Sequence, residues 1–170
     1  MKKLLLVTGL LLLCCSSSVA QDTPTIEVFG GYTYNRIVSA GSGLPINGNG
    51  WEAAADWNVN SWLGFKGDFE GAYCCHQQYF YGFLGGPQIS LRKEKYTVFV
   101  HALVGGAHAQ GLFTSDTDLA WALGGGVDWN VTRLVAIRVG QVDYFGTHFL
   151  NRGQNDLRVS AGFVFRFGKR

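Results

Sequence analysis

The chain has 170 residues, a formal net charge of +2, 15% charged residues, 14% aromatic residues and 24 glycines. No basic run is longer than RKEK at residues 92–95, so nothing in the sequence indicates a nucleic-acid-binding surface. Of the four cysteines, Cys14 and Cys15 lie in an expected leader, and the remaining two are too few for a disulfide framework.

Residues 1–20 have the three parts of a secretory signal peptide. Two lysines follow Met1, residues 4–13 are apolar, and residues 18–20 (SVA) form a small-residue cleavage site. The apolar segment is too short to span a bilayer as a helix. We therefore expect an exported protein with one mature domain, residues 21–170, in which 12 basic and 12 acidic residues balance.

The mature domain alternates with a period of two, and helical periodicity is almost absent. Successive side chains of a strand point to opposite faces. In residues 63–73 (LGFKGDFEGAY), aromatic side chains occupy one face and the ions occupy the other. The alternation predicts eight strands, at about residues 25–37, 51–59, 62–73, 78–91, 96–108, 119–130, 133–144 and 156–168.

The expected connections alternate in length along the chain. Short turns are expected at residues 60–61, 92–95 and 130–132. The other connections are mostly longer, at residues 39–50, 74–77, 109–118 and 145–155. Short turns at one end and longer loops at the other are typical of a transmembrane barrel with an even number of strands.

The bulk of the apolar face indicates that it points outward. It carries thirteen aromatic residues, and an eight-stranded barrel is only just wide enough to be filled by side chains. The opposite face consists of Gly, Ala, Ser and Thr with a few ions, which suits a narrow polar interior. The fold class predicted is therefore all-β: an eight-stranded antiparallel transmembrane β-barrel with up-and-down meander connectivity.

Two segments carry a family resemblance. EVFGGYTY at residues 27–34 resembles the opening strand of the small OmpA/OmpX-like outer-membrane β-barrel domains, and SAGFVFRF at residues 160–167 resembles their C-terminal assembly signal. The sequence departs from the family at residues 168–170 (GKR), which follow the signal, and at Pro87, which cannot donate a hydrogen bond within a strand.

The resemblance implies a place in the Gram-negative cell envelope and a set of partners. These are outer-membrane lipid and lipopolysaccharide, and the barrel-assembly machinery during biogenesis, with the chain as a monomer. The residues of the expected assembly signal are Ser160, Gly162, Phe165 and Phe167.

Charged residues on the inward face are the most specific chemical feature of the sequence. A charge in a narrow lumen must be paired or hydrated. We expect a salt-bridge network that plugs the barrel, and the alternative is a narrow porin-like channel for water, ions or small solutes. By parity the interior polar network comprises Glu27, Glu52, Asp56, Lys66, Asp68, Glu70, Asp128, Arg138, Arg158 and Arg166.

Cysteine and histidine residues give weaker signals. Cys74, Cys75 and His76 cluster in one loop, but a zinc site needs three or four ligands and adjacent cysteines pair poorly. We expect a vicinal disulfide or free thiols there, and no metal or cofactor. Some barrels similar to this chain modify lipid A with a His beside Ser or acidic residues, so an enzyme is a further alternative. The candidate histidines are His101, His108 and His148.

The function expected from the sequence is a non-enzymatic one, structural or in cell-surface interaction. The long loops would contact an extracellular partner, mainly through residues 39–50 and 145–155. Their apolar contact residues would be Leu44, Ile46, Phe145 and Phe149.

Overall fold

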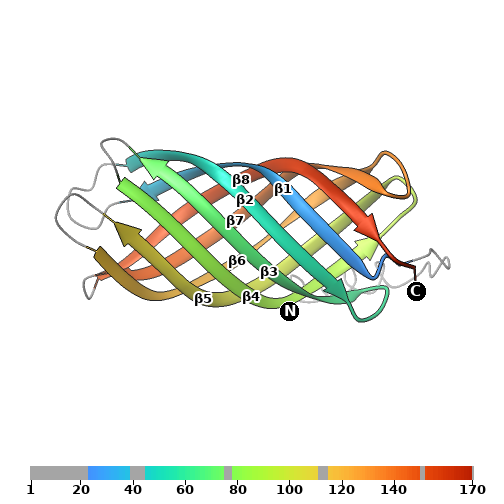
Figure 1. Ribbon diagram of the computed structural model, residues 1–170, viewed down its shortest axis with the longest axis horizontal. Coiled ribbons are helices and arrows are strands. Elements are labelled where there is room, and N and C mark those ends of the chain that lie inside the picture. Colours follow the sequence, from blue (N-terminus) through green and yellow to red (C-terminus); the bar gives the residue numbers. More distant parts are fainter. Residues whose placement is uncertain (1–22, 39–44, 75–77, 111–114, 150–151, 170) are drawn as a thin grey trace, which may run out of the picture.

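The computed structural model describes residues 23–38, 45–74, 78–110, 115–149 and 152–169. It is a closed barrel of eight strands (Figure 1). The strands are β1 (Ile26–Val38), β2 (Pro45–Asn58), β3 (Leu63–Cys74), β4 (Gln78–Arg92), β5 (Tyr96–Gln110), β6 (Ser115–Asn130), β7 (Val135–Phe149) and β8 (Arg152–Phe167).

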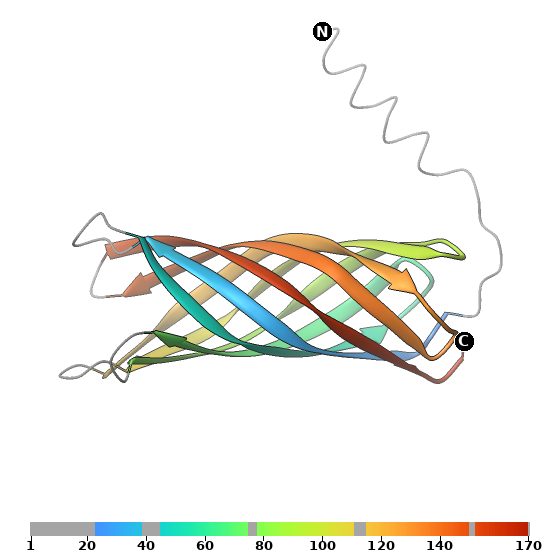
Figure 2. The ribbon, with the colours of Figure 1, turned by 90° about the horizontal axis from the view of Figure 1, so that it is seen from above.

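Every strand pairs antiparallel with the next one in sequence, which confirms the predicted meander. The barrel closes where β1 pairs with β8, from Ile26 opposite Phe167 to Ile37 opposite Asp156. Figures 1 and 2 show that β1 begins and the chain ends at the same end of the barrel. The β2–β3, β4–β5 and β6–β7 turns lie at that end, which we call the turn end, and the opposite end is the loop end.

No helix in the described residues is long and apolar enough to cross a membrane.

Several strands extend further toward the loop end than the sequence predicted. β2 begins at Pro45 rather than residue 51, and β6 begins at Ser115 rather than residue 119. β7 and β8 together leave only residues 150–151 between them. The expected long loops are therefore partly strand, because backbone pairing continues through Gly- and Asn-rich positions whose composition is typical of turns.

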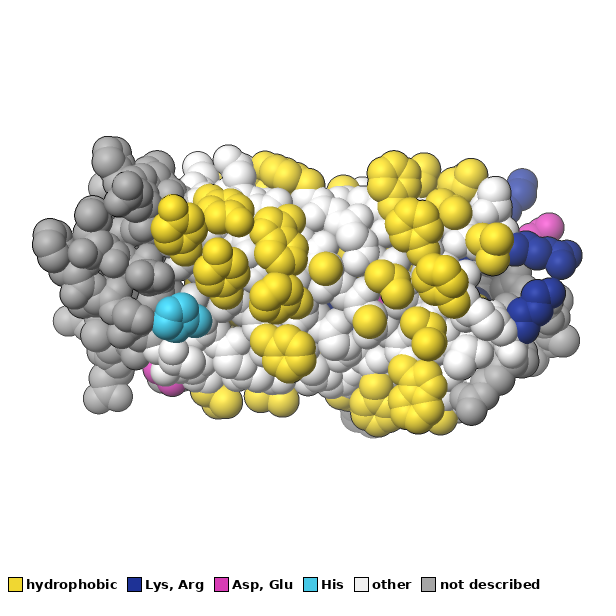
Figure 3. All heavy atoms as spheres, viewed as in Figure 1, with side chains coloured by type: hydrophobic (Ala, Val, Ile, Leu, Met, Phe, Trp, Pro, Cys, Tyr) yellow, Lys and Arg dark blue, Asp and Glu magenta, His cyan; other side chains and the backbone are white. Residues whose placement is uncertain are grey.

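The outer surface is apolar, and the alternating side chains produce it directly. On β8, Phe163, Phe165 and Phe167 are exposed while Val164 and Arg166 are buried. Large hydrophobic side chains gather toward both ends of the face seen in Figure 3. A closed barrel pairs its backbone groups internally, so this surface can contact lipid without unpaired strand edges. The structure is thus a membrane barrel with its apolar face outward.

A β-bulge interrupts the alternation in β7. Arg138 pairs with Gly162 of β8 and Gln141 pairs with Ser160, so one extra residue lies between the two pairs. A shift also occurs against β6. Strict alternation from the inward Arg138 would turn Gln141 and Asp143 outward. The bulge shifts the alternation by one residue, so both side chains face the lumen instead.

The interior contains more bulky apolar side chains than the sequence indicated. One cluster, toward the turn end, consists of Phe29, Ala54, Ala136 and Val164. A second consists of Leu84, Leu103, Ala107, Ala120, Ala122 and Phe145, with Phe80 packed against it. The prediction that Phe145 lies in a surface loop is therefore wrong: it is a buried residue of β7, 5.8 Å from the Phe80 ring centroid.

Candidate functional site

The structure places all ten residues of the sequence-predicted network in the barrel interior, each at most 7% exposed. They come from β1, β2, β3, β6, β7 and β8. Nine of them form three groups at different depths, and Asp56 lies apart from these groups. Further side chains that were not in the predicted set join them, among them Asn58, Arg92, His101, Gln141 and Asp143.

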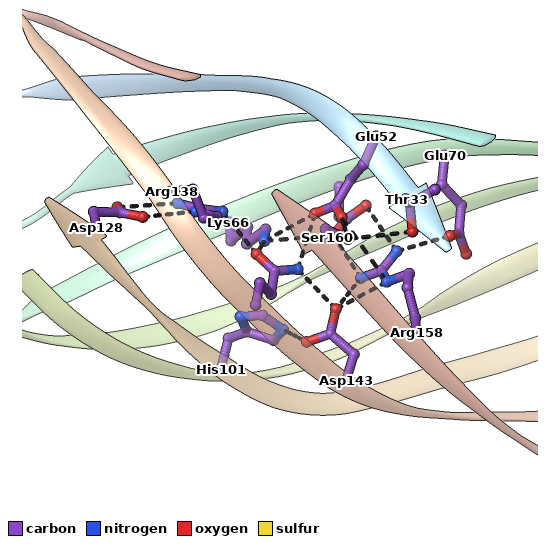
Figure 4. Close-up of polar contacts among 12 residues, drawn as sticks. Thr33, Glu52, Lys66, Glu70, His101, Asp128, Arg138, Asp143, Arg158 and Ser160 are labelled. Carbon is purple, nitrogen blue, oxygen red and sulfur yellow. Dashed lines mark hydrogen bonds and ion pairs between the residues drawn. The ribbon is translucent and has the colours of Figure 1, made fainter. Parts of the chain in front are cut away.

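Arg158 of β8 is the hub of the central cluster (Figure 4). Its guanidinium lies 2.7 Å from the Asp143 carboxylate, 3.0 Å from Asp68 and 2.9 Å from Glu70. These partners belong to β7 and β3, and all of the side chains are almost fully buried. One cation therefore joins three strands through charge-assisted contacts, which are the stronger kind of hydrogen bond.

Glu52 of β2 connects this hub to the rest of the cluster. Lys66 Nζ lies 3.5 Å from Glu52 and 3.5 Å from Asp68. Gln141 donates to Glu52 at 2.9 Å and to Asp143 at 2.7 Å. Ser160 also donates to Glu52. The bulge in β7 is what brings Gln141 and Asp143 into this network.

His101 of β5 completes the central cluster. Its Nε2 lies 2.9 Å from Asp143 Oδ1, and its ring stacks on Phe99 at 5.9 Å between centroids. The central cluster, as used below, is Glu52, Lys66, Asp68, Glu70, His101, Gln141, Asp143 and Arg158.

Arg138 and Asp128 form a pair between the central cluster and the turn end, and Arg138 Nη1 links this pair to the central cluster by donating to Gln141 Oε1 at 2.7 Å. Arg138 Nε and Nη2 lie 2.8 and 3.2 Å from the two carboxylate oxygens of Asp128. The Arg138 guanidinium also lies 4.2 Å from the centroid of Phe29 and 4.3 Å from that of Phe99. Such cation–π contacts partly compensate the loss of water around a buried cation.

Glu27 organises the group closest to the turn end. Arg166 contacts it at 2.8 Å and Arg92 at 2.6 Å, while the Asn58 amide donates to it at 2.9 Å. Glu27 and Arg166 are directly opposite across the β1–β8 seam. This ion pair therefore lies on the junction that closes the barrel.

Asp56 is the exception among the ten. It is 1% exposed, and its Oδ1 has no hydrogen-bond partner among the described residues. Its cross-strand neighbour Lys66 is directed to Glu52 and Asp68 instead.

Comparison with solved structures matches this barrel to bacterial outer-membrane proteins. Neisserial surface protein A superposes with a TM-score of 0.69 at 15% identity, over 84% of this chain and 97% of that one. The fold is that of the small outer-membrane β-barrels. The attachment invasion locus protein Ail of Yersinia pestis gives a TM-score of 0.55 at 17% identity, over 84% and 99% of the two chains.

The N-terminal barrel domain of Pseudomonas aeruginosa OprF belongs to the same set, with a TM-score of 0.57 at 9% identity, over 85% of this chain and 100% of that one. No protein-family model matches the sequence, and no curated protein matches it. The likeness is thus one of fold, as the predicted OmpA/OmpX-like resemblance implied.

In this outer-membrane barrel fold, the residues of the expected assembly signal divide between the two faces of β8. Ser160 is buried and Gly162 follows it in the lumen-facing row, whereas Phe165 and Phe167 are exposed outside. Ser160 therefore has an interior partner, Glu52, in addition to any role in assembly.

Of the remaining cysteine and histidine candidates, the structure describes the side chain of His108 alone. Cys75, His76 and the side chains of Cys74 and His148 lie outside the described residues. His108 is hydrogen-bonded to Thr117 of β6 at 2.7 Å, whereas His101, on the same strand β5, points into the lumen. Within the described part of the chain, no group of His, Cys, Asp and Glu side chains could hold a metal ion.

The pattern of apolar residues in β7 contained a signal for Gln141 and Asp143, the two interior residues that strict alternation missed. Val139 and Val142 are both exposed, although they are three residues apart, so the outward face changes parity between them. Gly140 lies in this interval, and a glycine inside a strand often marks a bulge. Together these features identify Asp143 as an inward residue.

Proposed function

We propose that this chain is an integral outer-membrane β-barrel protein with a non-enzymatic role, structural or in cell-surface interaction, whose lumen is closed by its ion-pair network. Support for an outer-membrane location comes from the apolar exterior, the barrel fold shared with outer-membrane proteins, and the expected signal peptide. The barrel is proposed to be a monomer in contact with outer-membrane lipid and lipopolysaccharide, inserted by the barrel-assembly machinery.

The observation that carries the closed lumen is the span of Arg158. Arg158 lies on β8 and reaches Asp68 and Glu70 on β3. Strands β8 and β3 are not neighbours in the barrel. The contact therefore crosses the interior rather than following its wall. The apolar cluster around Phe145 and Leu84 fills further interior space. Moving such a network aside would leave buried charges unpaired, which is costly.

The channel alternative also has a specific observation in its favour. Asp56 Oδ1, Gln88 Oε1 and His101 Nδ1 are buried without a hydrogen-bond partner among the described residues. Buried polar groups of this kind commonly bind internal water. A lumen that contains water could conduct small ions if the central cluster rearranged.

Planar-bilayer recordings distinguish the two. We expect no conductance steps from the wild-type barrel. Arg158→Ala, Lys66→Ala and Arg138→Ala each remove one interior cation, and we expect brief cation currents most readily from Arg158→Ala because it joins three strands. Arg36→Ala, an exposed position on β1, is the matched control. Steady currents from wild type would instead favour the channel.

A lipid A-modifying enzyme is the least supported alternative. Such a reaction needs its groups at the lipid-facing surface, whereas His101 is 3% exposed and directed at Asp143 in the lumen. Lipid A acylation measured in cells with and without the protein tests this: we expect identical lipid A profiles.

An external partner remains part of the proposal. Two of the similar structures are described as a surface protein and an attachment invasion locus protein. Residues 39–44, 75–77, 111–114 and 150–151 connect strands at the loop end. Replacing each segment with a Gly/Ser linker of equal length should reduce binding to host cells or matrix in at least one case. Unchanged binding in all four variants, with the folded barrel retained, would contradict a role in interaction.

A further inference from the structure

Basic side chains gather on the turns at one end of the barrel. We call Lys93, Lys95, Arg133 and Lys169 the basic rim: they lie in the β4–β5 turn, in the β6–β7 turn and after β8. Lys95, Arg133 and Lys169 are exposed, and Lys93 is half-buried. The dark blue atoms at the right of Figure 3 show Lys and Arg side chains protruding beyond the hydrophobic surface. Among the described residues of these three segments, Glu94 is the one acid.

Hydrogen bonds hold these segments together. Asn130 at the end of β6 donates two hydrogen bonds to the β4–β5 turn. Its backbone N–H donates to the Lys95 carbonyl at 2.9 Å, and its side-chain amide donates to the Lys93 carbonyl at 2.9 Å. The backbone N–H of Arg166 donates to the Leu134 carbonyl at 2.8 Å. The rim is therefore one connected arc over the β4–β8 side of the barrel.

The side chains next to the rim place it at the depth of lipid head groups. Tyr96 and Trp129 face each other across β5 and β6, directly beside the turns, and Trp129 is 53% exposed. Tyr and Trp favour the membrane–water interface. Leu134, beside Arg133 in the same turn, is 66% exposed. An exposed apolar residue next to a cation suits a lipid boundary better than a soluble partner in water.

We propose that the basic rim binds the phosphate groups of anionic glycerophospholipids in the leaflet that surrounds the turn end. The cations attract the lipid phosphates, and the aromatic and aliphatic residues beside them contact the upper acyl chains. This surface differs from the lumenal network and from the loop end, so it stands independently of the proposed interaction role.

Brominated-lipid quenching tests the proposal. Trp51→Phe and Trp121→Phe remove the two tryptophans nearest the loop end, leaving Trp129 beside the rim, and Trp57 and Trp62 at the β2–β3 turn of the same end, as reporters. The barrel is placed in nanodiscs of phosphatidylcholine containing brominated phosphatidylglycerol or brominated phosphatidylcholine. We expect phosphatidylglycerol to be preferred roughly two- to fivefold, and the preference to decline as salt is raised.

The variant K95Q/R133Q/K169Q should abolish that preference, whereas Arg36→Gln at the opposite end should retain it. Heat-modified electrophoretic mobility checks that each variant is folded. Equal quenching by the two lipids in wild type, or an unchanged preference in the triple variant, overturns the proposal. Soluble phosphate in 10-fold excess is the last control. If it removes the phosphatidylglycerol preference while other salts do not, the rim is a site for free anions, and the lipid proposal is overturned as well.

Discussion

At the scale of single residues, Asp56 and Asp128 illustrate two conditions of a buried carboxylate. Asp128 holds Arg138 through both oxygens, whereas Oδ1 of Asp56 has no hydrogen-bond partner among the described residues. Both are at most 3% exposed. Removing one member of a buried pair leaves the other charge uncompensated, while neutralising a carboxylate that has an unpartnered oxygen and no direct ion pair costs less.

We therefore expect Asp128→Asn to lower the free energy of unfolding by roughly 3 kcal/mol. Asp56→Asn replaces a carboxylate with an amide in the same way, and it should leave that free energy of unfolding unchanged or higher. Urea titration of the barrel refolded in phospholipid bilayers, followed by tryptophan fluorescence, measures both. Equal destabilisation by the two variants would mean that Asp56 makes a stabilising contact in the membrane.

At the scale of strands, tryptophan rings lie over glycines of the neighbouring strand. Trp121 of β6 is opposite Gly146 of β7, and a Cβ atom added to Gly146 would collide with its ring. Trp51 covers Gly71 in the same way across β2 and β3. Each pair replaces a missing side chain with a flat aromatic surface, which stabilises the register of the two strands.

Gly146→Ala should displace the Trp121 ring and lower the free energy of unfolding by roughly 1–3 kcal/mol. Gly106→Ala is the matched control, because the nearest atom to its added Cβ is 3.9 Å away. The same urea titration compares them. Comparable stability of the two variants would show that the ring moves aside without loss.

The β7 bulge leads to a deletion experiment. Removing Gly140 leaves Arg138, Gln141 and Asp143 all inward, because regular alternation then runs through the former bulge. We expect this variant to refold into a closed barrel. Removing Val142 instead also restores regular alternation but turns the Gln141 side chain outward toward lipid, so we expect that variant to be less stable than the Gly140 deletion. Heat-modifiable mobility on gels distinguishes folded from unfolded chains, and failure of the Gly140 deletion would assign the bulge an essential role.

The sequence predicted the strand number, meander and inward face because alternation repeats over more than ten residues in most strands. It failed where the pattern is local or weak. One extra residue in β7 hid Asp143, and Gly- and Asn-rich composition hid the beginning of β2. The partners of Arg158 were not predictable either, because parity gives the face of a side chain but not which of several carboxylates it reaches across the lumen.

At the scale of the whole molecule, the first and last strands pair along their length, and both described termini lie at the turn end (Figure 2). A circular permutant can therefore join residue 168 to residue 24 by a short Gly/Ser linker and open between Glu94 and Lys95. Every strand keeps both of its neighbours, so we expect wild-type refolding in detergent. In cells, we expect poor assembly because the proposed signal at Phe165 and Phe167 is no longer terminal. Efficient assembly of the permutant would contradict that signal.

The Glu27–Arg166 pair has a kinetic consequence. Its partners are 139 positions apart in the sequence, whereas the other strand pairings join consecutive strands. Non-local pairing is slow because the chain between the partners must first be ordered. Until this seam forms, β1 and β8 each present an open edge that another chain can pair with. Barrel closure is thus the step at which correct folding competes with aggregation, and the ion pair forms only once that competition has been decided.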